Sequence, residues 1–476
     1  MASINGEIRQ VARETTVQQI AENTSGLLKD STGQEMVDGL KLIAKRVAEQ
    51  GSSFYYELRI EIETGSICRA VTGAKVKEAV SVNGEAVLYL DQLGTWIVTG
   101  ETPAGKKMVT ELITAEAPGI HYLTARFKGI YGVRWAGTAS TACIRTDDSA
   151  ALDEPVSYVA GMAAGEYGSP YDEIQPWASM HTVEDEAAGT LVAIPKFWYK
   201  LSIAADKSIE IKIAAYPEDG FKVSPAHMDR GDGKGEREVV YVGRYHCGDG
   251  YKSMTGVKPL ANRTRAAFRS GIHGLGDDIW QNDIATRITL WLLYLVEYAD
   301  WNSQKKIGYG CGNNSSTENM GASDAMPYHT GTMMASKTEY GVGVQYRHIE
   351  GLWDNVLDWC DGIYFKDTEV YVMANPADFS DTANGTLVCT RPASSNFISA
   401  WQQAEEPFDW FLYPEAVAGG SDSYIGDYCF YASGGVVLRC GGDCYRVQDG
   451  GLFYLGGYNG AGAAGGGIGS RLLKLP

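Results

Sequence analysis

Short apolar runs that alternate with polar residues, separated by glycine-rich turns, are the pattern that most constrains this chain. In YYELRIEIETG, apolar residues at positions 56, 58, 60 and 62 alternate with charged ones, which is the period of a strand with one solvated face. Asn83-Gly84 provides a tight turn before further apolar runs. Together with 57 glycines and 28 tyrosines, this pattern favours short strands and many turns over helical bundles.

The 476 residues are too many for one ordinary core, so several domains are expected. Residues 53–128 carry the alternating runs and predict a small β-sandwich that resembles immunoglobulin-like modules. Such modules mostly act as spacers, and no binding site is expected there. Residues 129–476 are irregular and aromatic, and they predict a third, larger domain.

The first 52 residues predict short helices. Met36, Leu40, Ile43 and Val47 step by four, three and four residues and form one apolar stripe. The stripe must be buried, either in an oligomeric bundle or larger assembly, with a trimer favoured, or against its own chain. The first 20 residues lack a basic start followed by an apolar stretch, so no signal peptide is expected.

Charge and cysteine usage exclude several classes of function. The net charge of −18 and the lack of a basic stripe argue against a nucleic-acid partner. No window approaches 18 apolar residues, so membrane insertion is not expected. The nine cysteines include no CxxC pair and the seven histidines no HExxH motif, so we expect free thiols, no metal and no cofactor.

Two helices are predicted within residues 129–476. In DIATRITLWLLYLVEYADWNSQ, Ile284, Ile288 and Leu292 fall on one helical face. A shorter helix is predicted through RHIEGLWDNVLDWCDGIY. Three aspartates would share one face of it and form either a solvated edge or a calcium site; they are Asp354, Asp358 and Asp361.

These two stretches resemble a known family. LYLVEYADWNSQ is similar to the Glu-Tyr-Ala helix of formylglycine-generating-enzyme-like domains, and LWDNVLDWCDGIY resembles that family's Asn-Val-aromatic-acid-Trp segment. The closing VVLRCGGDCYR…GLFYL…IGSRLL resembles its final Arg-Gly-Gly strand and its terminal arginine motif. The resemblance covers about residues 131–476, within the domain expected at 129–476, and implies a variant of the C-type lectin fold. With the N-terminal helices and the β-sandwich, the expected fold class is a multidomain α+β protein.

One branch of that family is enzymatic, and it oxidises a cysteine of a sulfatase with a cysteine pair near its C-terminus. Cys440 and Cys444 are the corresponding candidates, although three residues separate them where the family has four. On a regular strand they would lie about 13 Å apart, too far for one metal ion or a disulfide. An oxidase using these two cysteines therefore remains an alternative, and we expect no enzymatic activity and no catalytic residue.

The other branch consists of binding modules, and the overall arrangement resembles phage and prophage tail proteins. In some of these, a diversity-generating retroelement rewrites a C-terminal variable segment by mutating template adenines, which cannot yield Lys, Glu, Gln, Met or Trp there. Residues 434–470 contain only one of these five types, Gln448. Either a glycine-rich loop is simply poor in long side chains, or, as the resemblance implies, residues 434–470 are a variable segment that binds a host-cell-surface protein or glycan.

The composition of this segment suits a binding surface, because rigid tyrosines set among small residues give contact area at low entropic cost. Leu438, Leu452, Leu455, Ile468 and Leu472 are expected to form its buried framework. Trp401 and Trp410 either line the same surface or lie in the core. The candidate ligand-binding residues are Asp443, Cys444, Tyr445, Arg446, Asp449, Tyr454, Tyr458, Asn459, Trp401 and Trp410.

The leading expectation is a non-enzymatic adhesin of a phage or prophage tail, made in the bacterial cytoplasm and assembled with other virion tail proteins. The glycine-rich stretch at 456–469, with eight glycines, would then be a binding surface whose variable positions hold mostly Gly and Ala. Tyr445, Arg446 and Tyr458 would carry most of its contacts. A cellular surface adhesin is a further alternative.

Overall fold

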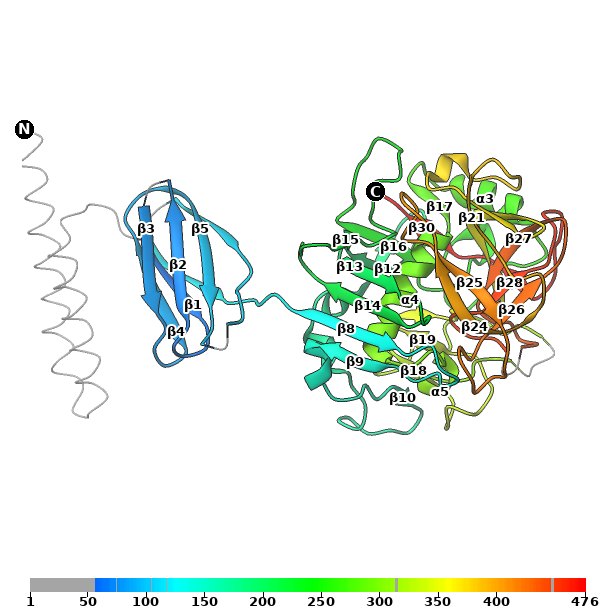
Figure 1. Cartoon of the computed structure of the whole chain (residues 1–476), viewed down its shortest axis with the longest axis horizontal. Coiled ribbons are helices and arrows are strands. Elements are labelled where there is room, and N and C mark those ends of the chain that lie inside the picture. Colours follow the sequence, from blue (N-terminus) through cyan, green and yellow to red (C-terminus); the bar gives the residue numbers. More distant parts are fainter. Residues whose placement is uncertain (1–55, 74, 104, 117, 313–315, 447–448) are drawn as a thin grey trace, which may run out of the picture. The chain divides into compact units, whose positions relative to one another are not determined.

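The computed structural model describes residues 56–476 except 74, 104, 117, 313–315 and 447–448, so the predicted helices of residues 1–52 lie outside the described part. The chain divides into two compact units between Lys128 and Gly129 (Figure 1). We call them the N-terminal unit and the C-terminal unit. Among the described residues, both are rich in β-strands, and the few helices lie in the C-terminal unit.

The described part of the N-terminal unit, from residue 56 on, forms two sheets around one core. The predicted strand is confirmed as β1, where Leu58 and Ile60 are fully buried. Its predicted solvated face is only partly so, because Glu57 is 2% exposed and forms an ion pair with Arg59. Trp96 and Val98 complete the same core from the other sheet. One sheet has the order β4 (Glu85–Leu90), β1 (Tyr56–Glu61), β7 (Gly119–Thr124), and the other has the order β3 (Lys75–Val80), β2 (Ile67–Thr72), β5 (Gly94–Glu101), β6 (Glu111–Ala115).

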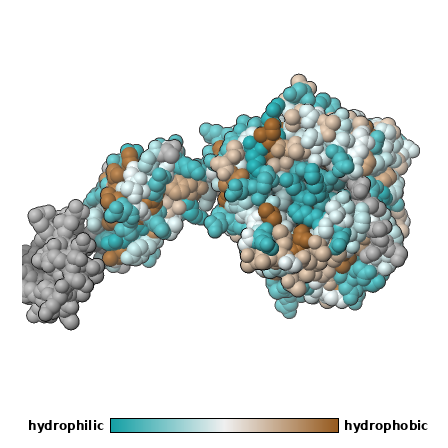
Figure 2. All heavy atoms as spheres, turned by 90° about the horizontal axis from the view of Figure 1, so that it is seen from below, coloured by the Kyte–Doolittle hydropathy of each residue, from teal (hydrophilic) through white to brown (hydrophobic). Residues whose placement is uncertain are grey.

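Two details of the N-terminal unit bear on its surface and turns. Asn83 and Gly84 both adopt left-handed φ angles, of 53° and 83°, which confirms the predicted tight turn. The outer face of the four-stranded sheet carries exposed apolar side chains in register across three strands, including Val76, Ile97 and Leu112. Hydrophobic residues are visible on the surface of this unit in Figure 2.

The C-terminal unit contains four sheets. Two of them have five strands each. The first has the order β15 (Lys222–Val223), β13 (Trp198–Ile203), β14 (Ile209–Ala214), β8 (Ile130–Trp135), β9 (Ile144–Asp147). The second has the order β11 (His181–Asp185), β12 (Gly189–Pro195), β16 (Val239–Gly243), β30 (Leu472–Lys474), β17 (Ile279–Gln281). A four-stranded sheet has the order β10 (Tyr158–Val159), β18 (Gly331–Thr332), β19 (Val344–Tyr346), β20 (Ile349–Glu350). The largest has the order β23 (Thr386–Thr390), β22 (Glu369–Val372), β21 (Leu357–Lys366), β27 (Gly435–Cys440), β28 (Leu455–Gly457), β26 (Tyr428–Tyr431), β24 (Asn396–Gln403), β25 (Leu412–Val417), and β29 (Ile468–Gly469) pairs with β21.

The first predicted helix is confirmed as α4 (Ile284–Tyr298), which is buried along its whole length. Asp283 caps it by accepting the backbone N–H of Thr286 at 2.8 Å. A helix that is buried on every side belongs to the centre of a core, and α4 lies among the strands of the C-terminal unit (Figure 1). The other α-helices in the described part of the chain are α3 (Arg265–His273) and α5 (Ser303–Lys306). No helix among the described residues is long and apolar enough to cross a membrane.

The prediction of a second helix through RHIEGLWDNVLDWCDGIY is wrong, because this stretch forms β20, a turn and β21. β21 lies in the middle of its sheet, paired with β22, β27 and β29. A central strand is apolar on both faces, and such a run cannot be told from a buried helix by periodicity alone.

The three aspartates of that stretch therefore do not share a helix face, and they do not form a solvated edge. Asp354, Asp358 and Asp361 are 1%, 2% and 0% exposed. Each carboxylate instead has partners within the fold: the backbone N–H groups of Cys311 and Gly343 for Asp354, His246 and Arg471 for Asp358, and the half-buried Arg269 for Asp361.

The end of the chain is built into the core. β30 lies between β16 and β17, and both Leu472 and Leu473 are fully buried. The guanidinium of Arg471 donates to the backbone carbonyls of Gly243 (2.8 Å) and Glu350 (2.7 Å). The IGSRLL motif thus returns the glycine-rich segment to a sheet.

Candidate ligand-binding face

The candidate site starts at the end of β27, where the chain turns sharply at Gly441. This glycine has a φ of 82°, and a Cβ there would lie 2.3 Å from the carbonyl oxygen of Leu352, so only glycine fits. In the turn that follows, Asp443 accepts the backbone N–H of Tyr445 at 3.1 Å and its carbonyl accepts that of Arg446 at 3.1 Å. The tyrosine side chain is thereby directed outward, where it is 59% exposed.

Arg446 connects this turn to the glycine-rich segment. Its guanidinium donates to Asp449 Oδ2 and to the hydroxyl of Tyr458, both at 3.0 Å. It also lies 4.7 Å above the ring centroid of Phe430 and 5.3 Å from that of Tyr454. These ionic, hydrogen-bonding and cation–π contacts hold a half-buried cation in one position.

A second arginine, Arg439, contacts Tyr458 as well. The guanidinium of Arg439 lies 4.2 Å from the ring centroid of Tyr458 and 5.9 Å from that of Trp359. Phe430 contacts Tyr458 with ring centroids 5.0 Å apart. Tyr458 is therefore fixed between an arginine and a phenylalanine, and it is only half-buried, so it presents a rigid aromatic surface.

The glycine-rich segment has two kinds of position. None of its glycines from 456 to 469 adopts a left-handed φ. At Gly462 and Gly466, both exposed, an added Cβ would have no atom within 4 Å. At Gly457 it would lie 2.5 Å from Arg391 Nη1, and at Gly469 2.8 Å from Val356 Cγ2. The middle of the segment can hold larger side chains, whereas its two ends cannot.

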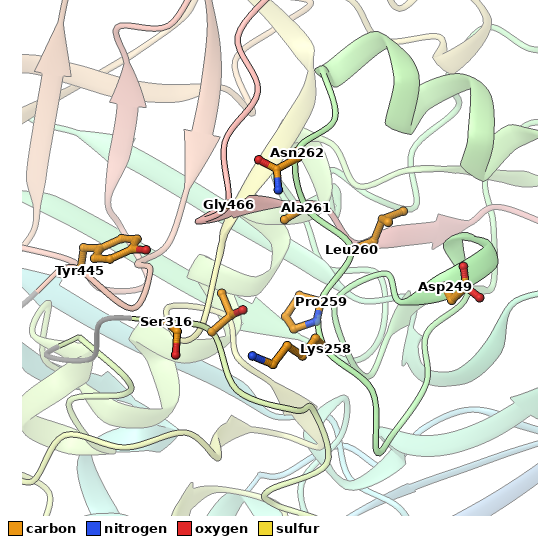
Figure 3. A pocket seen from close by; sticks show the side chains of 10 residues that line it. Asp249, Lys258, Pro259, Leu260, Ala261, Asn262, Ser316, Tyr445 and Gly466 are labelled. Atoms are coloured by element: carbon orange, nitrogen blue, oxygen red, sulfur yellow. The ribbon is translucent and has the colours of Figure 1, made fainter.

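A cavity of about 450 Å³ borders this surface. Tyr445 and the 258–262 segment lie on opposite sides of it, and Gly466 and Ser316 also line it (Figure 3). The backbone of Asn262 donates to the carbonyl of Gly465 at 3.0 Å, which ties the 258–262 segment to the glycine-rich one. Lys258 and Asp249 give the cavity one potential cation and one potential anion.

The structure divides the ten predicted site residues into two groups. Five of them have exposed or half-buried side chains and together form what we call the C-terminal face: Tyr445, Arg446, Asp449, Tyr458 and Asn459. The other five have buried side chains and do not reach the surface: Asp443, Cys444, Tyr454, Trp401 and Trp410.

The solvent-facing assignments of Asp443 and Cys444 are corrected by their burial, at 8% and 0% exposure. Asp443 is turned inward by its hydrogen bonds within the turn, and burial raises the pKa of its carboxyl group. The backbone N–H of Cys444 donates to the carbonyl of Asn355 at 3.1 Å, which holds this residue inside.

The aromatic candidates Trp401, Trp410 and Tyr454 belong to the core rather than to the surface. Trp401 stacks on Trp301, with ring centroids 5.6 Å apart, and Trp410 is only 4% exposed. Tyr454 lies beneath Arg446 and is 0% exposed. The predicted framework is confirmed as buried: Leu438, Leu452, Leu455, Ile468 and Leu472.

Three supporting residues were missed by the sequence reasoning: Tyr428, Phe430 and Arg439. Tyr428 and Phe430 lie with ring centroids 4.5 Å apart. The alternation of YCFY was a usable signal for this pair, because residues two apart on a strand share one face. Arg439 carried no comparable signal, since only the tertiary structure brings Tyr458 over it.

The two cysteines of the oxidase alternative are both inside the protein. Cys440, the last residue of β27, is 1% exposed, and Cys444 is 0% exposed. Burial raises the pKa of the Cys444 thiol, which disfavours the thiolate that a metal or an oxidation step needs. The neighbour of Cys440 is Cys360, whose pKa is raised well above its usual value by burial and by this contact.

No group of three or more His, Cys, Asp or Glu side chains that could hold a metal ion occurs among the described residues. Comparison with protein-family models and with curated proteins finds no match to this chain.

Proposed function

We propose that this chain is a phage or prophage tail adhesin whose C-terminal face binds a protein or glycan on the host-cell surface. In this proposal the C-terminal unit is a C-type-lectin-type, formylglycine-generating-enzyme-like domain without enzymatic activity. The N-terminal unit is an immunoglobulin-like spacer, and residues 1–52 join the protein, as a trimer, to other proteins of the virion tail.

This proposal is supported mainly by a contrast between two kinds of position in the glycine-rich segment. We call a position open where an added Cβ would meet no atom within 4 Å, and closed where it would clash with a neighbouring residue. The open positions Gly462 and Gly466 lie between two closed ones, Gly457 and Gly469. A segment built in this way can change its exposed side chains without disturbing the core beneath it. That is the property that a diversified binding surface requires, and it agrees with the residue types found at 434–470.

The C-terminal face also has the composition of a paratope. Tyr445 supplies exposed aromatic area, and Tyr458 is held rigidly by Arg439 and Phe430. Rigid tyrosines lose little entropy on binding, and small neighbours allow close approach of a partner. The adjoining cavity of about 450 Å³ could receive a protruding side chain or sugar.

The experiment is a binding measurement with the purified full-length chain on a panel of bacterial strains, read by flow cytometry. Tyr445→Ala and Tyr458→Ala are expected to lower binding to a positive strain at least tenfold. Tyr122→Ala is the matched control, because this tyrosine is 76% exposed on the N-terminal unit. Equal loss with the control variant, or full binding by both C-terminal variants, would contradict the proposed face.

A further inference from the structure

A second cavity of about 450 Å³ lies elsewhere in the C-terminal unit, and it shares no lining residue with the cavity at Tyr445. Its walls come from the β11–β12 hairpin, the turn after β16, the loop at 324–329 and the turn between β19 and β20. We call it the His348 cavity. Most of the side chains that line it are polar, which sets it apart from the apolar pockets that bind most drug-like ligands.

One wall of the His348 cavity includes Asp324, whose carboxylate is held in a fixed position. Asp324 accepts hydrogen bonds from the guanidinium of Arg244 (3.3 Å) and from the hydroxyls of Tyr245 and Thr255. Its side chain is still 39% exposed. The carboxylate is thus held in place by three donors while part of it faces the cavity.

Arg244 is held just as firmly. Its Nε donates to the Tyr245 hydroxyl at 2.8 Å, and its Nη1 donates to the backbone carbonyl of His348 at 3.0 Å. Burial raises the pKa of Tyr245 to about 12, with a further rise from its hydrogen bond to Asp324, so the phenol stays neutral. The charge of this arginine is balanced locally by the aspartate.

Beside Arg244, a strained turn contributes an imidazole to the cavity lining. Arg347 and His348 both have left-handed φ angles, of 44° and 69°, a conformation that costs free energy for residues of this kind. The turn is held by the buried ion pair of Arg347 with Glu297, whose atoms Nη2 and Oε1 are 2.5 Å apart. Asp172 adds a second contact to Arg347 at 2.9 Å.

The imidazole of His348 is neutral and available. Burial, followed by the nearby His329, lowers its pKa to about 3. In the part of the chain that the structure describes, no group hydrogen bonds to its ring nitrogens. A neutral imidazole offers one donor and one acceptor, which is the complement of a hydroxyl group.

We propose that the His348 cavity binds a neutral, polyhydroxylated ligand, namely one or two uncharged sugar residues. The cavity presents fixed acceptors and donors. The arginine in its lining, Arg244, is balanced by Asp324, and Glu184 in the same lining adds a negative charge. An anionic ligand is therefore disfavoured. Met326, Pro327 and Tyr328 provide the apolar surface on which the C–H face of a sugar ring can pack. This inference is independent of the role proposed for the C-terminal face.

The test is saturation-transfer NMR and calorimetry on the full-length chain with glucose, galactose, mannose and N-acetylglucosamine as probes. At least one neutral sugar is expected to bind, and Asp324→Asn and His348→Ala are expected to weaken its binding at least tenfold. His181→Ala is the matched control, since this exposed histidine lies on β11 but does not line the cavity. Binding by Tyr445→Ala is expected to equal that of the wild type, which separates this cavity from the C-terminal face.

Folding of each variant is checked by its thermal unfolding, and His348→Asn serves as a second variant because asparagine tolerates a left-handed φ. This variant, which keeps a donor and an acceptor, is expected to retain more binding than His348→Ala. The proposal is overturned if none of the four sugars binds the wild type, or if His348→Ala, folded, binds as well as the wild type does. Tighter binding of glucuronate than of glucose would also overturn it, because the cavity would then select an anion.

Discussion

Alanine substitutions in the glycine-rich segment are expected to separate open from closed positions by the sign of their effect on stability. At Gly462 the added methyl group meets no atom within 4 Å and φ is not left-handed. Gly462→Ala should therefore raise the free energy of unfolding by about 0.5 kcal/mol, because alanine restricts the unfolded chain more than glycine does.

At Gly457 the same methyl group lies 2.5 Å from Arg391 Nη1 and 3.2 Å from the carbonyl oxygen of Phe430. Arg391 also donates to the carbonyl of Gly457 at 2.7 Å, so moving it away breaks a buried hydrogen bond. Overpacking of this kind costs about 1–3 kcal/mol, and Gly457→Ala should lower the free energy of unfolding by that amount.

The assay is urea denaturation of the full-length chain, with the transition of the C-terminal unit followed by tryptophan fluorescence. Gly466→Ala serves as a replicate of the open position, and Gly469→Ala as a replicate of the closed one, since its methyl group would lie 2.8 Å from Val356 Cγ2. Equal destabilisation by Gly462→Ala and Gly457→Ala would refute the distinction between the two kinds of position.

Other substitutions test the core and its charges by the same denaturation. Burial raises the pKa of Asp427 from 3.8 to about 7, so the contribution of this group to stability is complete below pH 3.8 and is lost as pH rises through 7. Asp427→Asn should therefore reduce the fall in the free energy of unfolding between about pH 4 and 7. An unchanged dependence of that free energy on pH would contradict this. Arg347→Met leaves the buried Glu297 unpaired and should cost about 3–5 kcal/mol, with Glu297→Gln in the same chain restoring part of it; no recovery would argue against this pairing. Leu438→Ala should cost about 2–5 kcal/mol and Tyr445→Ala less than about 0.5, and similar losses for the two would contradict the division into core and face.

The parts of the fold that the sequence predicts well are those where one local pattern has one interpretation. The apolar stripe through Ile284 and Ile288 is long enough to exclude a strand, and it forms α4. The alternation at Leu58 and Ile60 forms β1. The leucines of the variable segment are buried as expected, as are Phe453 and Ile468, because large apolar side chains set among many glycines are the ones that gain most from burial.

The failures come from contacts that no local pattern encodes. β21 was predicted as a helix because burial on both faces gives a central strand the same apolar density. Trp401 follows irregular sequence, and only the tertiary structure places it against Trp301. Arg439 lies in β27 and Tyr458 just after β28. Their spacing along the chain therefore gave no indication that the two side chains are in contact.

The most direct test of the central claim is a display selection with the full-length chain. Positions 460, 462, 464 and 466, which are exposed, would be randomised in one library, and the exposed positions 76, 80, 112 and 120 of the N-terminal unit in a control library. Both would be selected for binding to several bacterial strains. We predict that the first library yields different enriched sequences for different strains and that the control library yields none. Strain-specific enrichment from the control library alone, or from neither library, would contradict the claim that the C-terminal segment is a binding surface whose exposed positions can hold different side chains.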